Sequence, residues 1–280
     1  MKLLRVGNKG KEKPAALDTN SKIRDLSSVI KDLTPDNLTH STIEKLKSLD
    51  LGNLPELSNS ERIGSCISNP GKFVAIGLNY LDHAEETGAK VPSEPIVFMK
   101  ATSCVNGPND DIEITSYSKK LDWEVELGIV IGKEAKNISE KNSSDHILGY
   151  CLVNDISERE WQIEKMGQWV KGKSHDTFGP IGPYLVTSDE IKDVNNLNLS
   201  LDLNGKRMQT GNTNKMIFNV YYIVAYLSKY MSLQAGDIIT TGTPPGVGMG
   251  KKPQVFLKNG DTLRLSIDNL GEQNSKVISV

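Results

Sequence analysis

Three acidic residues stand where they could bind a metal ion together. Glu124 and Glu126 lie in the segment Glu124–Ile131, which predicts a strand, so their side chains share one face. Asp155 ends a second apolar strand, just before a predicted helix. Three carboxylates without a Cys or His partner suit Mg²⁺, Mn²⁺ or Ca²⁺ better than zinc. The same residues also fit a solvent-facing strand edge and a helix N-cap, so both interpretations stay open at this point.

A second candidate site lies in the segment from Gly77 to Gly88. His83 and Glu86 are three residues apart, which places them on one face of a short helix and within hydrogen-bond reach. A carboxylate that orients an imidazole makes a general base. An ordinary surface pair on a helix has the same spacing, so these two residues alone do not identify a catalytic site.

A third candidate is a lysine in a segment framed by Gly and Pro, residues 168–183. Lys173, held rigidly near a metal ion, would supply positive charge to an oxyanion or a carboxylate. A freely solvated lysine is the alternative. His175, two residues later, is expected to have a packing or hydrogen-bonding role.

Composition limits the kind of protein that carries these groups. The 280 residues contain 33 Lys and Arg against 35 Asp and Glu, a formal net charge of −2. This balance excludes a nucleic-acid binder that works by bulk positive charge. Cys66, Cys104 and Cys151 form no C-x-x-C pair and no disulfide framework. This cysteine pattern favours a reduced, intracellular compartment, so we expect a cytoplasmic protein. No apolar run is long enough for a membrane span, so we expect no membrane partner.

The elements that must position these groups differ along the chain. The sequence predicts that residues 1–70 form a small N-terminal domain. This domain has predicted strands at Lys2–Val6 and Ala15–Leu17 and helix-start residues in Thr34–Leu51. Residues 71–280 are predicted to form the catalytic domain, in which short β-rich runs are separated by Gly, Pro, Asn and Asp. Its two predicted helices are Ile156–Lys165 and Asn214–Met231. The fold class is therefore α+β and mostly β, with a large mixed sheet that is rolled or sandwiched.

These motifs, in this order, resemble the fumarylacetoacetate hydrolase family. The resemblance covers about residues 71–280, and residues 1–70 are similar to the small N-terminal domain of bacterial members. The matching strings are GLNYLDHAEETG, VFMKA, DWEVELGIVIGKEA, GYCLVNDISERE, QWVKGKSHDTFGPIGP and TGTPPGVGMG. The resemblance implies a mixed β-sandwich roll of the family's C-terminal type and a homodimer.

The resemblance also assigns roles to residues of this sequence. It implies that Glu124, Glu126 and Asp155 bind Mg²⁺ or Mn²⁺, and that His83 and Glu86 activate water from a helix that acts as a lid. It matches Lys173 to the active-site lysine and Gln162 to a substrate-contacting glutamine. It matches Gly242 and Thr243 to the loop that holds the substrate carboxylate.

The implied reaction is hydrolysis of a C–C bond in a 2,4-dioxo acid, which gives pyruvate and a second acid. Three further strings, MKLLRVGNKGKEKPA, EPIVFMKATS and DTFGPIGPYLVT, look most like those of bacterial enzymes that hydrolyse 2,4-dioxo-3-deoxy sugar acids. The alternatives are a ureidoglycolate lyase, and an oxaloacetate tautomerase or 2-hydroxy-dienoate isomerase using the same metal–enolate chemistry. Acylpyruvate hydrolases often carry Arg where this chain has Leu78, which argues against a small acylpyruvate. His175 replaces the usual Phe, which changes the expected shape of the pocket.

Overall fold

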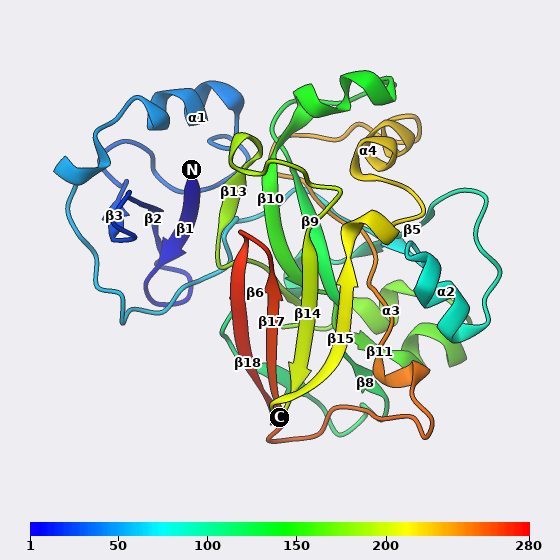
Figure 1. Ribbon diagram of the computed structural model, residues 1–280. Helices are drawn as coiled ribbons and strands as arrows, with labels where there is room; N and C mark the ends of the chain where they lie inside the picture. Colours follow the sequence, from blue (N-terminus) through cyan, green and yellow to red (C-terminus); the bar gives the residue numbers. More distant parts are fainter.

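The computed structural model describes residues 1–280, apart from the side chain of Thr87. Two β-sheets dominate it and lie face to face (Figure 1). The larger sheet has nine strands in the order β3 (Ile23–Asp25), β2 (Lys13–Leu17), β1 (Lys2–Val6), β13 (Leu185–Thr187), β10 (Ile147–Asn154), β9 (Val125–Ile131), β16 (Ile238–Thr240), β4 (Phe73–Gly77) and β5 (Ile96–Lys100).

The second sheet has five strands and covers the middle of the first. Its order is β15 (Lys206–Asn212), β14 (Asn198–Leu203), β17 (Thr262–Ile267), β18 (Gly271–Ser279) and β7 (Ile112–Ile114). Strands β14 and β17 contact β9, and β17 and β18 contact β10. Two short pairs complete the β structure: β8 (Leu121–Asp122) with β11 (Ser157–Glu158), and β6 (Val105–Asn106) with β12 (Gly179–Pro180). The predicted mostly-β sandwich is confirmed.

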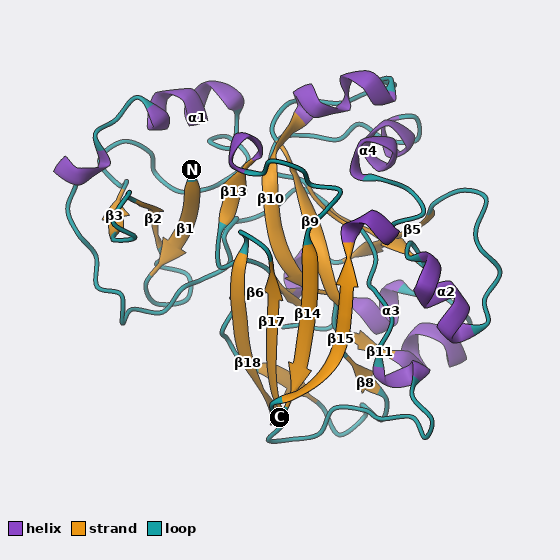
Figure 2. Ribbon diagram, in the orientation of Figure 1, coloured by secondary structure: helices purple, strands orange, loops and turns teal.

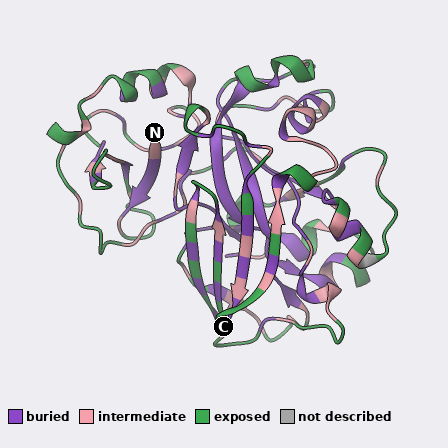
Figure 3. Cartoon of the chain, viewed as in Figure 1, coloured by how far each residue is buried: buried purple, intermediate pink, exposed green. Residues whose placement is uncertain are grey.

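The amino-acid patterns explain which strands lie inside. Strands β9 and β10 are nearly continuous apolar runs, and every residue in them is buried, as expected for strands covered on both faces. Strands β14 and β17 alternate between buried and more exposed residues, as expected for a sheet with one covered face. Figure 3 shows this difference between the solidly buried central strands and the banded strands in front of them.

Helices lie around the sandwich, as Figure 2 shows. They are α1 (His40–Lys47), α2 (Leu81–Thr87), α3 (Val170–Lys173) and α4 (Val220–Ser228). Helix α4 is shorter than the predicted Asn214–Met231, because Asn219 caps it by accepting from the N–H groups of Tyr221 and Tyr222. Helix α1 begins after its cap Thr39 and not at Thr34, so the prediction for this segment was too long.

The predicted helix Ile156–Lys165 was wrong in part. The structure has the short strand β11 there, followed by a π-helical turn at Glu160–Glu164. Glu158 in β11 is fully buried, and its carboxylate accepts from the N–H groups of Lys119 and Lys120. This long-range pairing with the β8 segment outweighs local helix propensity.

Residues 1–70 are joined to the rest of the molecule by strand pairing. Strand β1 pairs with β2 and, on its other edge, with β13, so β1, β2 and β3 extend the nine-stranded sheet. The division into residues 1–70 and 71–280 stays a prediction. Across the described residues, no helix combines the length and apolar character needed to cross a bilayer.

Candidate active site

The three predicted metal ligands converge at one end of the central strand pair. Antiparallel pairing of β9 with β10 sets Val125 opposite Asn154, so the residues beside them are neighbours. The Asp155 N–H donates to the Glu124 carbonyl at 2.9 Å. One carboxylate oxygen from each of Glu124, Glu126 and Asp155 lies within 4.8 Å of the others, and all three residues are buried. The interpretation of Glu124 and Glu126 as a solvent-facing strand edge is therefore wrong.

Two buried lysines are bonded to these acids. Lys173 Nζ donates to Glu124 Oε2 at 2.7 Å and to Asp155 Oδ2 at 2.6 Å. Lys100 Nζ, at the end of β5, donates to Asp155 Oδ1 at 2.6 Å and also to the Lys173 carbonyl. Both lysines are almost completely buried, so Lys173 is not the solvated lysine that the sequence left open.

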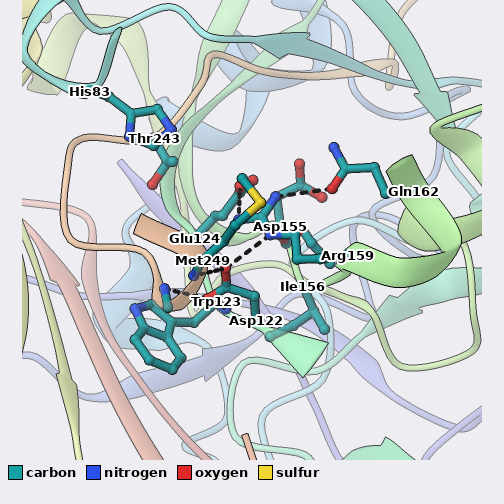
Figure 4. A network of polar contacts seen from close by, with 12 residues as sticks. His83, Asp122, Trp123, Glu124, Asp155, Ile156, Arg159, Gln162, Thr243 and Met249 are labelled. Carbon is teal, nitrogen blue, oxygen red and sulfur yellow. Dashed lines mark hydrogen bonds and ion pairs between the residues drawn. The ribbon is translucent and has the colours of Figure 1, made fainter. Parts of the chain in front are cut away.

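A buried arginine links Glu124 to a fourth carboxylate. Arg159 Nη2 donates to Glu124 Oε1 at 2.6 Å, and its Nε donates to Asp122 Oδ2 at 2.9 Å. Its Nη1 donates to Gln162 Oε1 at 3.0 Å, which orients the predicted substrate-contacting amide. Figure 4 shows this network, with Gln162 on one side of the carboxylates and His83 and Thr243 on the other.

Sequence reasoning assigned no role to Lys100, Arg159 or Asp122, although all three lie in the matching strings. The available signal was a charged residue at the end of an apolar run, as in VFMKA. A lysine or arginine buried this deeply requires a charged partner, but the sequence did not show which partner each would meet.

The surrounding charges act oppositely on two of the predicted ligands. Burial opposes ionisation of Glu124, but the positive charges and hydrogen bonds of Arg159 and Lys173 outweigh it and hold its pKa far below the ordinary value. Burial, together with the negative charges of Asp155 and Glu124, raises the pKa of Glu126 well above its ordinary value. A cation added beside Glu126 would favour the charged form of this carboxyl group.

The donor set fits a hard divalent ion. It consists of carboxylate oxygens, which Mg²⁺ and Mn²⁺ accept. Glu126 Oε2 accepts from the Gly242 N–H at 2.7 Å and from the Thr240 hydroxyl. Among the described residues, no basic side chain makes a hydrogen bond to Glu126. A divalent ion bound by Glu124, Glu126 and Asp155 would supply the positive charge that this carboxylate needs.

His83 and Glu86 face each other on α2, as their spacing predicts. His83 Nδ1 lies 3.2 Å from Glu86 Oε2, and the Gly246 N–H donates to the same carboxylate at 3.0 Å. Burial works against the Glu86 charge, but the bonds from His83 and Gly246 keep its pKa below the ordinary value. Glu86 is therefore an ionised partner that holds the imidazole in place.

A cavity of about 250 Å³ joins these groups. Its lining includes His83, Glu124, Glu126, Arg159, Gln162, Lys173, Gly242 and Thr243. Asp155 is fully buried and reaches this region through Lys173. The Gly242 N–H is already bonded to Glu126, and the Thr243 hydroxyl donates to the Val125 carbonyl at 2.9 Å. The predicted substrate-carboxylate role of these last two residues stays a prediction.

The chain matches a known protein family over most of its length. Residues 72–278 match the family described as fumarylacetoacetate (FAA) hydrolase C-terminal. A protein of Burkholderia ambifaria named "Putative hydrolase" is 58% identical over 274 residues, which cover 98% of this chain and 97% of that protein.

Solved structures share the whole fold. Maleylpyruvate hydrolase from Sphingobium sp. SYK-6, solved with manganese(II) ion and pyruvate, superposes with a TM-score of 0.84 at 25% identity, covering 100% of this chain and 99% of that one. 5-Carboxymethyl-2-hydroxymuconate delta-isomerase from Mycobacterium smegmatis gives a TM-score of 0.79 at 28% identity, with 100% and 99% covered. Proteins similar to this chain thus include both a hydrolase and an isomerase by name.

Proposed function

The chain belongs to the fumarylacetoacetate hydrolase family, and on that premise we propose that it is a divalent-metal-dependent hydrolase. It cleaves the C–C bond of a 2,4-dioxo acid and releases pyruvate and a second acid. The observation that carries the proposal is the convergence of three buried carboxylates beside a cavity that a His–Glu pair also lines. The sequence strings favour a 2,4-dioxo-3-deoxy sugar acid as the type of substrate.

Glu124, Glu126 and Asp155 would hold Mg²⁺ or Mn²⁺. When bound there, the ion supplies Lewis-acid polarisation of the oxygens of a 2-oxo acid. A manganese ion together with pyruvate in the similar maleylpyruvate hydrolase supports this assignment. The two ions accept the same ligands, so the residues present do not favour one over the other.

The remaining side chains would perform the proton transfers and stabilise charge. His83, held by ionised Glu86, removes a proton from a water molecule, and the water oxygen attacks C4 of the substrate. The C3–C4 bond then breaks, its electron pair stays on C3, and a proton is added there to give pyruvate. Lys173 and the amide group of Gln162 stabilise the negative oxygen that forms on C4. Both residues line the cavity, so they can reach this oxygen.

An isomerase is the second candidate, because one of the solved structures similar to this chain carries that name. An isomerase moves a proton and consumes no water. The two reactions are therefore distinguished by their products and by the need for a water-activating pair.

The test is a substrate panel followed by NMR, with the protein loaded with Mg²⁺ or Mn²⁺ and with a chelator as control. The panel contains 2,4-dioxo-3-deoxy sugar acids, acylpyruvates, ureidoglycolate and oxaloacetate. We expect pyruvate plus a second acid, with loss of activity in chelator. Glyoxylate and urea, or a tautomer without cleavage, would contradict the proposal.

A pair of matched variants tests the role of Glu86. Glu86→Gln is expected to abolish cleavage and leave metal affinity nearly unchanged, because Glu86 lies outside the three ligands. Glu85→Gln, which changes the exposed neighbouring acid, serves as the control and should keep the activity. Equal turnover in the two variants would remove the His83–Glu86 pair from the mechanism.

A further inference from the structure

Leu78 has a backbone conformation that its side chain disfavours. It follows β4 directly and has a φ of +50°, in the left-handed region that Gly and Asn occupy at lower cost. A leucine there is strained. Strained residues of this kind cluster at functional sites, where neighbouring structure holds them in place.

The residues on either side of Leu78 are fixed. Gly77 is the last residue of β4 and pairs with Ile96 of β5. Asn79 is fully buried, and its amide donates to the Phe218 carbonyl at 3.0 Å and to the Thr241 carbonyl at 2.8 Å. The turn is therefore determined by its neighbours, and an Asn or Gly at position 78 would fit it with less strain. What a leucine adds is its apolar side chain.

Leu78 lines the active-site cavity together with other apolar residues. These are Ile76, Ala89, Ile96, Phe98, Ile163, Trp169 and Met249. The Trp169 ring packs directly on Gly77, where an added Cβ would lie 2.5 Å from it. The same ring meets Phe98 edge-on, with centroids 5.2 Å apart. The part of the apolar wall around Gly77, Phe98 and Trp169 is thus closely packed, whereas Ile96 and Ile163 are exposed.

The basic side chains that line this cavity already bond to carboxylates. Lys173 and Arg159 bond to the carboxylates, and His83 is held by Glu86. A second carboxylate on the substrate, or a row of hydroxyl groups, would lose its hydration against the apolar wall without gaining equivalent partners. An alkyl or aryl group would be stabilised there by burial.

We infer that Leu78 is a specificity-determining residue, and that the group attached to C4 of the substrate is an apolar chain or ring. This inference rests on the proposed cleavage of a 2,4-dioxo acid and specifies the part of the substrate that leaves as the second acid. It differs from the hydroxylated chain that the sequence strings favour.

Binding of unreactive 2-oxo acids tests the wall without requiring any reaction. Calorimetry with Mn²⁺-loaded protein would compare 2-oxobutanoate, 2-oxooctanoate, 2-oxoglutarate and a 2-oxo-3-deoxy sugar acid. We expect affinity to rise up to about fourfold for each methylene that is buried, with 2-oxooctanoate the tightest ligand. Tighter binding of 2-oxoglutarate or of the sugar acid would overturn the inference.

Cleavage assays test Leu78 itself. With hexanoylpyruvate as the apolar substrate, Leu78→Asn should lower kcat/KM about tenfold or more, relative to a 2,4-dioxo-3-deoxy sugar acid. The variant should unfold at the same or a higher temperature, because Asn suits the backbone. Met166→Asn is the matched control, since Met166 also has a positive φ of 66° but is 92% exposed and outside the cavity lining.

The outcomes separate the two proposals. An unchanged substrate preference in Leu78→Asn would overturn the role of Leu78. Cleavage that is faster with the sugar acid than with hexanoylpyruvate in the unaltered protein would overturn the apolar preference and leave the proposed function intact. Absence of cleavage of every 2,4-dioxo acid would refute the proposed function, and the calorimetric comparison would still decide the character of the wall.

Discussion

The acids of the site differ in how their charge is balanced. Asp122, Glu124 and Asp155 are each hydrogen-bonded to buried basic groups, which are supplied by Lys100, Lys173 and Arg159. Glu126 instead accepts from a hydroxyl and a backbone N–H. When Glu126 is ionised, four carboxylates face three cations. A divalent ion together with a substrate carboxylate would make the net charge of this buried set zero. A neutral set costs less electrostatic energy to bury.

Replacement of Glu126 tests this balance. Glu126→Gln keeps the shape of the side chain but removes a charge that the proposed ion needs. We expect the affinity for Mn²⁺ to fall about 100-fold or more, while the metal-free protein is as stable as before or more stable, because repulsion from Asp155 and Glu124 is relieved. Calorimetric titration with Mn²⁺ and thermal unfolding without it measure the two effects.

Glu134→Gln is a suitable control for that experiment, because Glu134 is exposed. If Mn²⁺ binding is unchanged in Glu126→Gln, Glu126 is not a ligand.

Lys100 provides the opposite test. Lys100→Met leaves the buried Asp155 carboxylate with one cation fewer, and we expect the metal-free protein to lose about 3–5 kcal/mol of unfolding free energy. Mn²⁺ should restore part of that loss, because the ion supplies positive charge beside Asp155. Urea unfolding of both proteins, with and without Mn²⁺, gives the comparison. An equal loss in both conditions would show that Lys100 acts only through packing.

At the scale of single residues, the sequence predicted the three converging acids and Lys173, but not the other charged residues of the network. Strand periodicity placed Glu124 and Glu126 on one face, and Asp155 ended an apolar run, so all three could be chosen. Lys100, Arg159 and Asp122 join the network only through contacts with residues distant along the chain. Periodicity contains no information about such contacts.

Among the elements, the end of β4 and the start of α3 are joined by a close contact. Gly77 leaves room for the Trp169 ring, and an alanine there would place its Cβ 2.5 Å from Cζ3 of that ring. The apolar wall of the cavity therefore depends on the small size of the last residue of β4.

A double-mutant cycle measures this contact. Gly77→Ala should lower the unfolding free energy by about 1–3 kcal/mol, because the Trp169 ring must move. In a Trp169→Leu background the same change should cost much less, since the clashing ring is gone. Urea unfolding of the four proteins yields the coupling, and equal losses in both backgrounds would contradict the steric explanation.

Element boundaries were predictable where local signals decided them. The β1 strand matches its prediction, and Asn219 gives α4 a start that cap chemistry explains. The segment after Asp155 was mispredicted because Glu158 is paired with the β8 segment and surrounded by backbone donors. The sequence of this segment alone favours a helix. The strand β11 forms there because it pairs with β8, which lies far away along the chain.

Across the whole molecule, an ion-pair network fastens the N-terminal strands to the rest. Glu12 accepts from Arg62 at 2.8 Å and from Arg5 of β1 at 3.2 Å, and Arg62 also binds Asp110. Burial opposes the Glu12 charge, but the hydrogen bond and charge of Arg62, aided by Arg5, hold its pKa below the ordinary value.

The lowered pKa of Glu12 predicts how its contribution varies with pH. A carboxyl group with a lowered pKa in the folded state stabilises the protein above its unfolded-state pKa, and this is lost as the pH falls through the folded value. Glu12→Gln should therefore cost about 1–3 kcal/mol at neutral pH and progressively less in acid. Urea unfolding across this range, with the exposed-site variant Glu61→Gln as control, checks it. A loss that does not vary with pH would contradict the ionic explanation.

The pairing of β1 with β13 has a consequence for how the protein is made. Lys2 and Leu3 lie opposite Val186 and Leu185, so ribosomes release the first strand long before they synthesise its neighbour. Until then β1, β2 and β3 can form only a three-stranded sheet of short strands, in which the outer edge of β1 lacks its partner β13. The nine-stranded sheet is therefore completed late in translation, after most of the polypeptide has emerged.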